Sequence, residues 1–168
     1  MAGLTLAALL AGCGGGHPPS SSARPVKPKP PLDRFLSVDA AHHAVDLTLI
    51  AGDGSANNGF NFDGYGRGEL VVHVPVGWKV TVHCKNDGTL PNSCAVVSGP
   101  GATGPAFPGA TTPNPVAGFA SGRSATFRFT ASRVGSYRLA SLVTGHERAR
   151  MWDLLEVTQG GRPSIGAR

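Results

Sequence analysis

Short runs in which apolar and polar residues alternate recur along the chain from about Phe35 onward. The clearest run is 124–130, in which Ala125, Phe127 and Phe129 fall on one face. Alternation of this kind predicts β-strands that have one buried face and one solvated face. Further runs of similar length lie between turns rich in Gly, Pro, Asn and Asp, at residues 44–50, 69–74, 78–84, 94–97, 137–143 and 152–157.

These runs predict an all-β domain, because no long segment has the period of an α-helix. Short strands separated by Gly and Pro turns are typical of a Greek-key β-sandwich, for which we expect about seven or eight strands. One connection, Gly99 to Gly122, is long for a compact domain and is rich in Gly, Pro and Thr. It is either a functional loop or a mobile one.

The composition agrees with a small domain that has many turns. The chain has 168 residues, of which 24 are Gly and 14 are Pro, while aromatic residues make up only 7%. Its formal net charge of +5 raises the question of a nucleic-acid partner. The Lys and Arg residues are scattered or lie towards the two ends, without a basic stripe interleaved with aromatic residues, so we expect no nucleic-acid partner.

The N-terminus predicts export. Residues 4–11 form an apolar run that is too short to span a bilayer but fits the central region of a secretory signal peptide. The run ends in Leu10-Ala11-Gly12-Cys13, which resembles the lipobox of bacterial lipoproteins. The resemblance implies that residues 1–12 are removed and that Cys13 carries a lipid. The alternative is a plain signal peptide followed by a chance cysteine.

The lipobox resemblance implies an extracytoplasmic protein, anchored to a membrane at the cell surface or in the periplasm. Residues 13–34 are rich in Gly, Ser and Pro, and such a segment cannot bury enough apolar surface to offset its ordering entropy. We therefore expect a flexible tether at 13–34 and a folded domain at 35–160. A disordered tail is expected at 161–168.

The chain has three cysteines, an odd number for an exported protein. If Cys13 is acylated, Cys84 and Cys94 remain as a pair on either side of a turn that contains Gly, Asn and Pro. In an oxidising compartment we expect these two residues to form a disulfide.

The sequence contains no evident catalytic constellation, and we predict no enzyme activity. It has no Gly-x-Ser-x-Gly nucleophile elbow, and no His and Asp in the sequence are evident partners of Ser141 in a catalytic triad. The acidic residues are dispersed, and most have a strand context that predicts a solvated side chain. His73 and His83 alternate with apolar neighbours, so we expect both to face solvent.

Four segments of the chain carry a distinctive pattern. They are Phe-Asn-Phe-Asp-Gly-Tyr at 60–65, Val-Pro-Val-Gly-Trp-Lys-Val-Thr-Val at 74–82, Asn-Asp-Gly-Thr-Leu-Pro-Asn-Ser at 86–93 and Gly-His-Glu-Arg-Ala-Arg-Met-Trp at 145–152. In this order and spacing they resemble sulfocyanin, a blue-copper family of the cupredoxin superfamily. The likeness spans roughly residues 45–157. It implies a cupredoxin-like Greek-key sandwich.

The resemblance also implies a copper site, in which the family uses two His, one Cys and a weak axial Met. Residue by residue, the second His falls on His146 and the Met on Met151, whereas the first His falls on Asn92 and the Cys on Ser141. An amide is a neutral, hard donor, and a serine hydroxyl must first lose a proton of high pKa, so two of the four positions carry poor copper ligands.

The resemblance and its departures together predict a lipid-anchored binding or accessory module whose type 1 copper site is lost. A redox or copper-handling protein is the expected partner, and the expected cofactor is none, or copper if any. One alternative is a copper electron carrier that uses His146 and Met151 with Cys94 as a substitute ligand, since Cys94 shares a strand face with Asn92. Another is a structural envelope-interaction domain. Without copper, His146 is free to hydrogen-bond Ser141 or Asn92.

Overall fold

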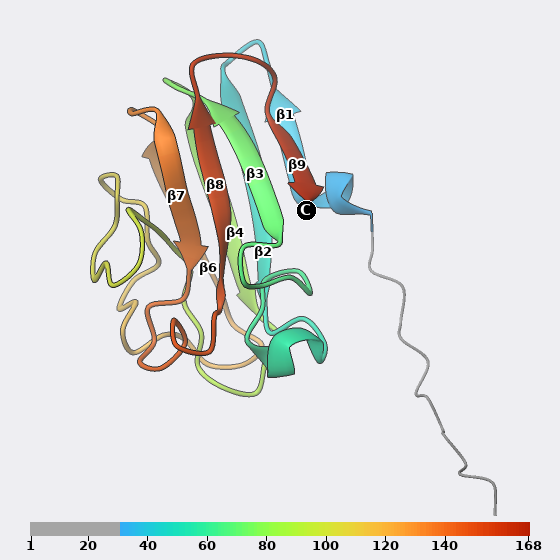
Figure 1. The fold of residues 1–168 in the computed structure, drawn as a ribbon, viewed down its shortest axis with the longest axis vertical. Helices are drawn as coiled ribbons and strands as arrows, with labels where there is room; N and C mark the ends of the chain where they lie inside the picture. The colour runs from blue at the N-terminus through green and yellow to red at the C-terminus, as the bar shows by residue number, and fades with distance from the viewer. Residues whose placement is uncertain (1–30) are drawn as a thin grey trace, which may run out of the picture.

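The computed structural model describes residues 31–168, and within this range nine β-strands form two sheets that pack face to face (Figure 1). The same range contains two short 3-10 helices and no α-helix. In chain order the elements are η1 (Leu32–Phe35), β1 (Leu36–Asp39), β2 (Ala44–Ala51), η2 (Ala56–Gly59), β3 (Leu70–Pro75), β4 (Lys79–Asn86), β5 (Ala95–Val97), β6 (Ser124–Thr130), β7 (Gly135–Ala140), β8 (Trp152–Thr158) and β9 (Ser164–Ala167).

The two sheets have the strand orders β1-β2-β4-β6 and β5-β7-β8-β3-β9. Every connection from β2 to β7 carries the chain from one sheet to the other, which is the Greek-key manner of building a sandwich. Two of the pairings, β2 with β4 and β3 with β8, are parallel. The predicted all-β sandwich is confirmed, with one or two more strands than expected.

The core lies between the sheets and follows the alternation in the sequence. Val45, Leu47 and Leu49 of β2 point inward, as do Phe127 and Phe129 of β6. Burying a side chain of this size contributes about 1.5–3 kcal/mol, so these positions hold the two layers together.

Both ends of the domain differ from the prediction. The expected disordered tail instead contains β9, which pairs antiparallel with β3 and packs Ile165 against the core. At the other end, the expected tether already contains η1, which leads to the buried Phe35. The composition of both segments indicates disorder. Backbone pairing with β3 orders the C-terminal segment, and the buried side chain of Phe35 orders the N-terminal one. Cys13, the lipobox and the remainder of the tether lie outside the described residues.

The connection 99–122 is packed against the sandwich. Phe107 is buried and stacks on Phe129 at 5.3 Å between ring centroids. The backbone of this connection also continues the sheet beyond β5, since Val96 N–H donates to the Ala110 carbonyl at 2.8 Å. Of the two interpretations of this loop, the structure therefore disfavours the mobile one. Among the described residues, no helix has the length and apolar character needed to cross a membrane.

A disulfide joins Cys84 of β4 to Cys94, just before β5, so it links the two sheets. The bond closes a loop with a sequence separation of 10. Loops of about this size restrict the unfolded chain enough to contribute about 3 kcal/mol.

Replacing both cysteines with alanine is therefore expected to lower the free energy of unfolding by about 3 kcal/mol. Guanidinium unfolding of the oxidised protein and of the Cys84→Ala/Cys94→Ala variant measures the difference. Wild-type protein treated with a reductant is the control and should match the variant. Equal midpoints for the oxidised protein and the variant would contradict the expectation.

Candidate functional site

Three loops gather at one end of the sandwich, the end at the bottom of Figure 1. They are residues 52–66 after β2, residues 87–94 after β4, and residues 141–151 between β7 and β8. These loops carry three of the four segments that resemble sulfocyanin, so the structure brings the predicted site positions to one place.

The 141–151 loop is shaped by its own backbone hydrogen bonds. Met151 N–H donates to the His146 carbonyl at 2.9 Å, and Ser141 N–H donates to the Met151 carbonyl at 3.4 Å. Gly145, with φ of +90°, makes the turn into His146 in a conformation that favours glycine. As a result Ser141, His146 and Met151 are all directed inward, with exposures of 1%, 5% and 0%.

Ser141 is the centre of a closed hydrogen-bond network. Its Oγ lies 2.9 Å from His146 Nδ1, and it accepts a bond from Ser93 N–H at 3.3 Å. The Ser93 hydroxyl lies 3.4 Å from the same Oγ and accepts from Leu142 N–H at 2.9 Å. Of the two partners expected for a metal-free His146, the structure thus selects Ser141.

Asn92 belongs to a second network, formed by amide side chains. Its Nδ2 donates to Asn86 Oδ1 at 2.8 Å and to the Leu90 carbonyl at 3.2 Å. Asn86 in turn donates to the carbonyls of Leu90 and Phe119. Asn92 is 3% exposed, and its Oδ1 is buried without a hydrogen-bond partner in the described part of the chain.

The donor set at this end of the sandwich does not fit a type 1 copper ion. At the two positions that the resemblance assigns to thiolate and imidazole, Ser141 and Asn92 offer a hydroxyl and an amide, and both side chains already make hydrogen bonds. The sulfur of Cys94, the substitute ligand in the alternative hypothesis, lies in the disulfide. No group of three or more His, Cys, Asp or Glu side chains within residues 31–168 is placed to hold a metal ion.

Burial also acts on the protonation of His146. Because the ring lies away from water, desolvation lowers its pKa, and the neutral imidazole is favoured. Phe60 meets the ring edge-on, with 5.2 Å between centroids. Next to Phe60, the His146 ring is therefore a neutral, hydrogen-bonded imidazole.

The Phe-Asn-Phe-Asp-Gly-Tyr segment is a tight turn that positions the loop above His146. Phe62 and Tyr65 exchange two backbone hydrogen bonds, and Asp63 exchanges two with Ile50, one through its carboxylate Oδ1 at 2.9 Å. Most acidic residues are exposed or half-buried, as expected, but Asp63 and Asp153 are exceptions that are fully buried. Both accept backbone N–H bonds at strand ends, a role that alternation alone does not reveal.

The other four histidines of residues 31–168 lie outside the three loops of the site. His83 is exposed on β4 and lies 3.5 Å from Asp46, in agreement with the solvent-facing orientation expected for it. His73 on β3 is half-buried. His42 pairs with Asp39 at 2.7 Å, and His43 stacks on Trp78. Three of the four thus have a polar or aromatic partner, whereas His73 is less exposed than its strand alternation predicts.

Comparison with solved structures defines the class of fold. A blue copper oxidase from Nitrosomonas europaea aligns with a TM-score of 0.50 and 23% identity, over 67% of this chain and 38% of that one. A reduced auracyanin from the photosynthetic bacterium Roseiflexus castenholzii gives a TM-score of 0.49 and 21% identity, over 67% of this chain and 96% of that one. The sandwich with its end loops is a cupredoxin fold.

Sequence comparison then defines the family within that class. The sulfocyanin (SoxE) domain family matches residues 31–161. A sulfocyanin from Sulfolobus acidocaldarius is 31% identical over 129 residues, which cover 69% of this chain and 64% of that protein. The chain therefore belongs to the sulfocyanin family, although it spans slightly less than two thirds of this relative's length.

Two residues that shape the site were missed by sequence reasoning. Ser93 and Asn86 both lie in the third resembling segment and are buried hydrogen-bond centres. The available signal was the concentration of Asn and Ser in a segment that leads into an apolar strand, since buried polar side chains there require internal partners.

Proposed function

We propose that this sulfocyanin-family domain is a metal-free binding module and does not carry electrons through a type 1 copper site. The observation that carries the proposal is the network around Ser141. Ser141 stands at the position that the resemblance assigns to the copper-binding thiolate. Its hydroxyl lies 2.9 Å from His146 Nδ1 and also contacts the Ser93 hydroxyl. A copper ion would have to break these bonds and would gain only poor ligands in exchange.

The proposal includes an extracytoplasmic location with a lipid at Cys13, outside the described residues. Family membership and the lipobox-like sequence support it. On a tether, the site end of the domain could meet a redox or copper-handling protein or another ligand at the membrane surface. Mass spectrometry of the membrane fraction tests the anchor, because a diacylated Cys13 adds the mass of the lipid and Cys13→Ala abolishes it.

The test of the metal-free site uses the full-length chain with Cys13→Ala, which removes the lipid and a stray thiol. We expect less than stoichiometric copper after addition of Cu(II) and desalting, and no intense blue band, because no thiolate is available for charge transfer to copper. Metal analysis and the visible spectrum measure the two quantities. An intense blue band with one retained copper ion would contradict the proposal.

A second candidate function, copper-dependent electron transfer, is favoured by one observation. The family match extends over the site, and the resemblance assigns His146 and Met151 to two of the family's ligand positions. This function needs a third strong ligand, and Cys94 can supply it only after reduction of the disulfide. The copper titration in the presence and absence of a reductant separates the two functions.

A further inference from the structure

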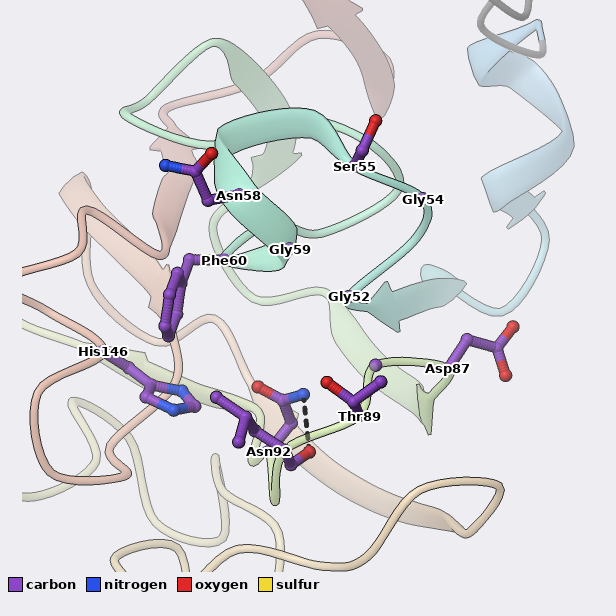
Figure 2. Close-up of a pocket in the computed structure, with 12 residues that line it drawn as sticks. Gly52, Gly54, Ser55, Asn58, Gly59, Phe60, Asp87, Thr89, Asn92 and His146 are labelled. Carbon is purple, nitrogen blue, oxygen red and sulfur yellow. Dashed lines mark hydrogen bonds between the residues drawn. The ribbon is translucent and has the colours of Figure 1, made fainter.

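A pocket of about 380 Å³ opens between the 52–60 loop and the 87–92 loop (Figure 2). The backbones of Gly52 and Gly88 meet at its base, where a Cβ on Gly52 would lie 2.5 Å from Gly88 Cα. His146 and Asn92 form its inner wall, and Phe60 lies beside them (Figure 2). The outer rim carries the polar side chains of Ser55, Asn58, Asp87 and Thr89.

The orientation of the Asn92 amide is fixed by its neighbours. Asn86 directs its Nδ2 to two backbone carbonyls, so its Oδ1 is the atom that faces Asn92. Asn92 must therefore present Nδ2 to Asn86 and to the Leu90 carbonyl. Its Oδ1 is left as a buried acceptor without a partner, turned in Figure 2 towards the side where His146 lies. An unpaired buried acceptor costs about 1–3 kcal/mol, which a donor on a ligand would recover.

The tautomer of His146 follows from the network on its other edge. The chain Leu142 N–H to Ser93 Oγ, Ser93 O–H to Ser141 Oγ, and Ser141 O–H to His146 Nδ1 gives every proton an acceptor. If His146 Nδ1 instead donated to Ser141, and Ser141 to Ser93, the Ser93 hydroxyl proton would have no acceptor. Nδ1 is thus the acceptor, and Nε2 carries the hydrogen. Nε2 has no partner among residues 31–168, so its N–H is free to donate into the pocket.

The inner wall therefore offers one free donor beside one free acceptor, and its charge is close to neutral. The one carboxylate at the rim, Asp87, is already paired with Lys85 at 2.9 Å. In the described part of the chain, no Lys or Arg lines the pocket. An anionic ligand finds no cation there, and it would also meet the lone pairs of Asn92 Oδ1.

We propose that this pocket binds a neutral saccharide. A sugar hydroxyl donates and accepts from a single oxygen, which matches a free acceptor beside a free donor. The C–H face of a sugar ring suits the aromatic ring of Phe60, and the Thr89 hydroxyl, which lies near Asn92 in Figure 2, can bond a further hydroxyl. A trans peptide fits less well, because its N–H and C=O point in opposite directions and cannot both face one wall.

The binding test uses the full-length Cys13→Ala protein labelled with ¹⁵N and titrated with glucose, mannose or N-acetylglucosamine up to about 50 mM, enough to detect a millimolar Kd. At least one sugar should give saturable shifts at the amides of Gly59 and Gly88 and at the His146 ring. Acetate and acetamide are the class controls. Shifts with either control but with no sugar, or shifts with none of the five, would overturn the proposal.

Variants separate recognition from folding. Asn92→Leu removes the free acceptor, and Phe60→Leu removes the aromatic face, so each should weaken sugar binding at least tenfold. Gln159→Leu, which deletes an exposed amide in the β8–β9 turn, is the matched control and should bind within twofold of wild type. Amide spectra establish that each variant is folded. Unchanged affinity in both folded pocket variants would overturn the proposal.

The inference rests on the proposed function in one respect: His146 must be free of metal. Failure of the metal-free site and failure of the saccharide pocket give different experimental results. Stoichiometric copper in the wild-type protein refutes the metal-free site whatever the sugars do. No copper and no sugar binding refutes the saccharide pocket alone. A long-range ¹⁵N–¹H spectrum of the His146 ring adds a ligand-free readout, since hydrogen on Nδ1 would remove the donor on which the pocket depends.

Discussion

The Asn92→His/Ser141→Cys double variant is expected to bind one copper ion and to turn blue. The substitutions place imidazole and thiolate at the two positions to which the family resemblance assigns missing copper ligands, with His146 and Met151 assigned to the other two. Replacing Ser141 also removes the hydroxyl now 2.9 Å from His146 Nδ1, which frees that nitrogen as a ligand. Thiolate, two imidazoles and a thioether are the ligands of blue-copper sites, so the visible band should rise from none to intense.

The two single variants are the matched controls for this experiment. Asn92→His alone lacks a thiolate and should stay colourless, while Ser141→Cys alone supplies the thiolate with only one histidine and should hold copper more weakly. The Cys84–Cys94 disulfide must remain intact in all three proteins, which mass spectrometry checks. A folded double variant with an intact disulfide that stays colourless would show that Asn92 and Ser141 are not the ligand positions.

The Asp63→Asn variant is expected to lose most of the pH dependence of stability between about pH 5 and pH 8. Asp63 is 0% exposed, and only one of its carboxylate oxygens has a hydrogen-bond partner in the described part of the protein. Burial, together with the negative charges of Asp53 and Asp153, raises the pKa of Asp63 from 3.8 to about 8, against the opposing effect of the Ile50 N–H bond.

The sign of the pH dependence follows from this raised pKa. Between about pH 4 and pH 8 the folded protein keeps the proton and the unfolded chain releases it, so stability is greatest at low pH and falls as the pH rises. The slope approaches about 1.4 kcal/mol per pH unit. Guanidinium unfolding of wild type and Asp63→Asn at pH 5, 6, 7 and 8 measures it. His146 acts in the opposite direction, because burial lowers its pKa, and subtraction of the variant's curve removes that contribution. Parallel curves would refute the role of Asp63.

The sequence predicts this fold well where a strand has one wet face. For β6, the predicted range 124–130 coincides with the strand, because Phe127 and Phe129 alternate with exposed polar residues. β9 escapes prediction because its Ser-Ile-Gly-Ala sequence has one large apolar residue and is ordered by backbone bonds to β3. Long-range pairing of this kind leaves no periodic signal.

The candidate site is predictable in part for a similar reason. Short spacing within one loop places Ser141, His146 and Met151 together from sequence alone. The contact between Ser93 and Ser141 joins residues 48 positions apart, and the burial of Asp63 depends on the turn that pairs it with Ile50. Neither contact has a local signature, so only the fold reveals that polar side chains satisfy one another there.

The closed network of Ser93, Ser141 and His146 also bears on how the protein matures. A protein that needs an ion to satisfy its buried groups gains stability from that ion by mass action, so its folded fraction follows the metal supply. Here the chain's own hydroxyls satisfy the imidazole nitrogen that faces inward. If the site is metal-free as proposed, the folded fraction of the domain should not depend on the supply of metal or on a metallochaperone.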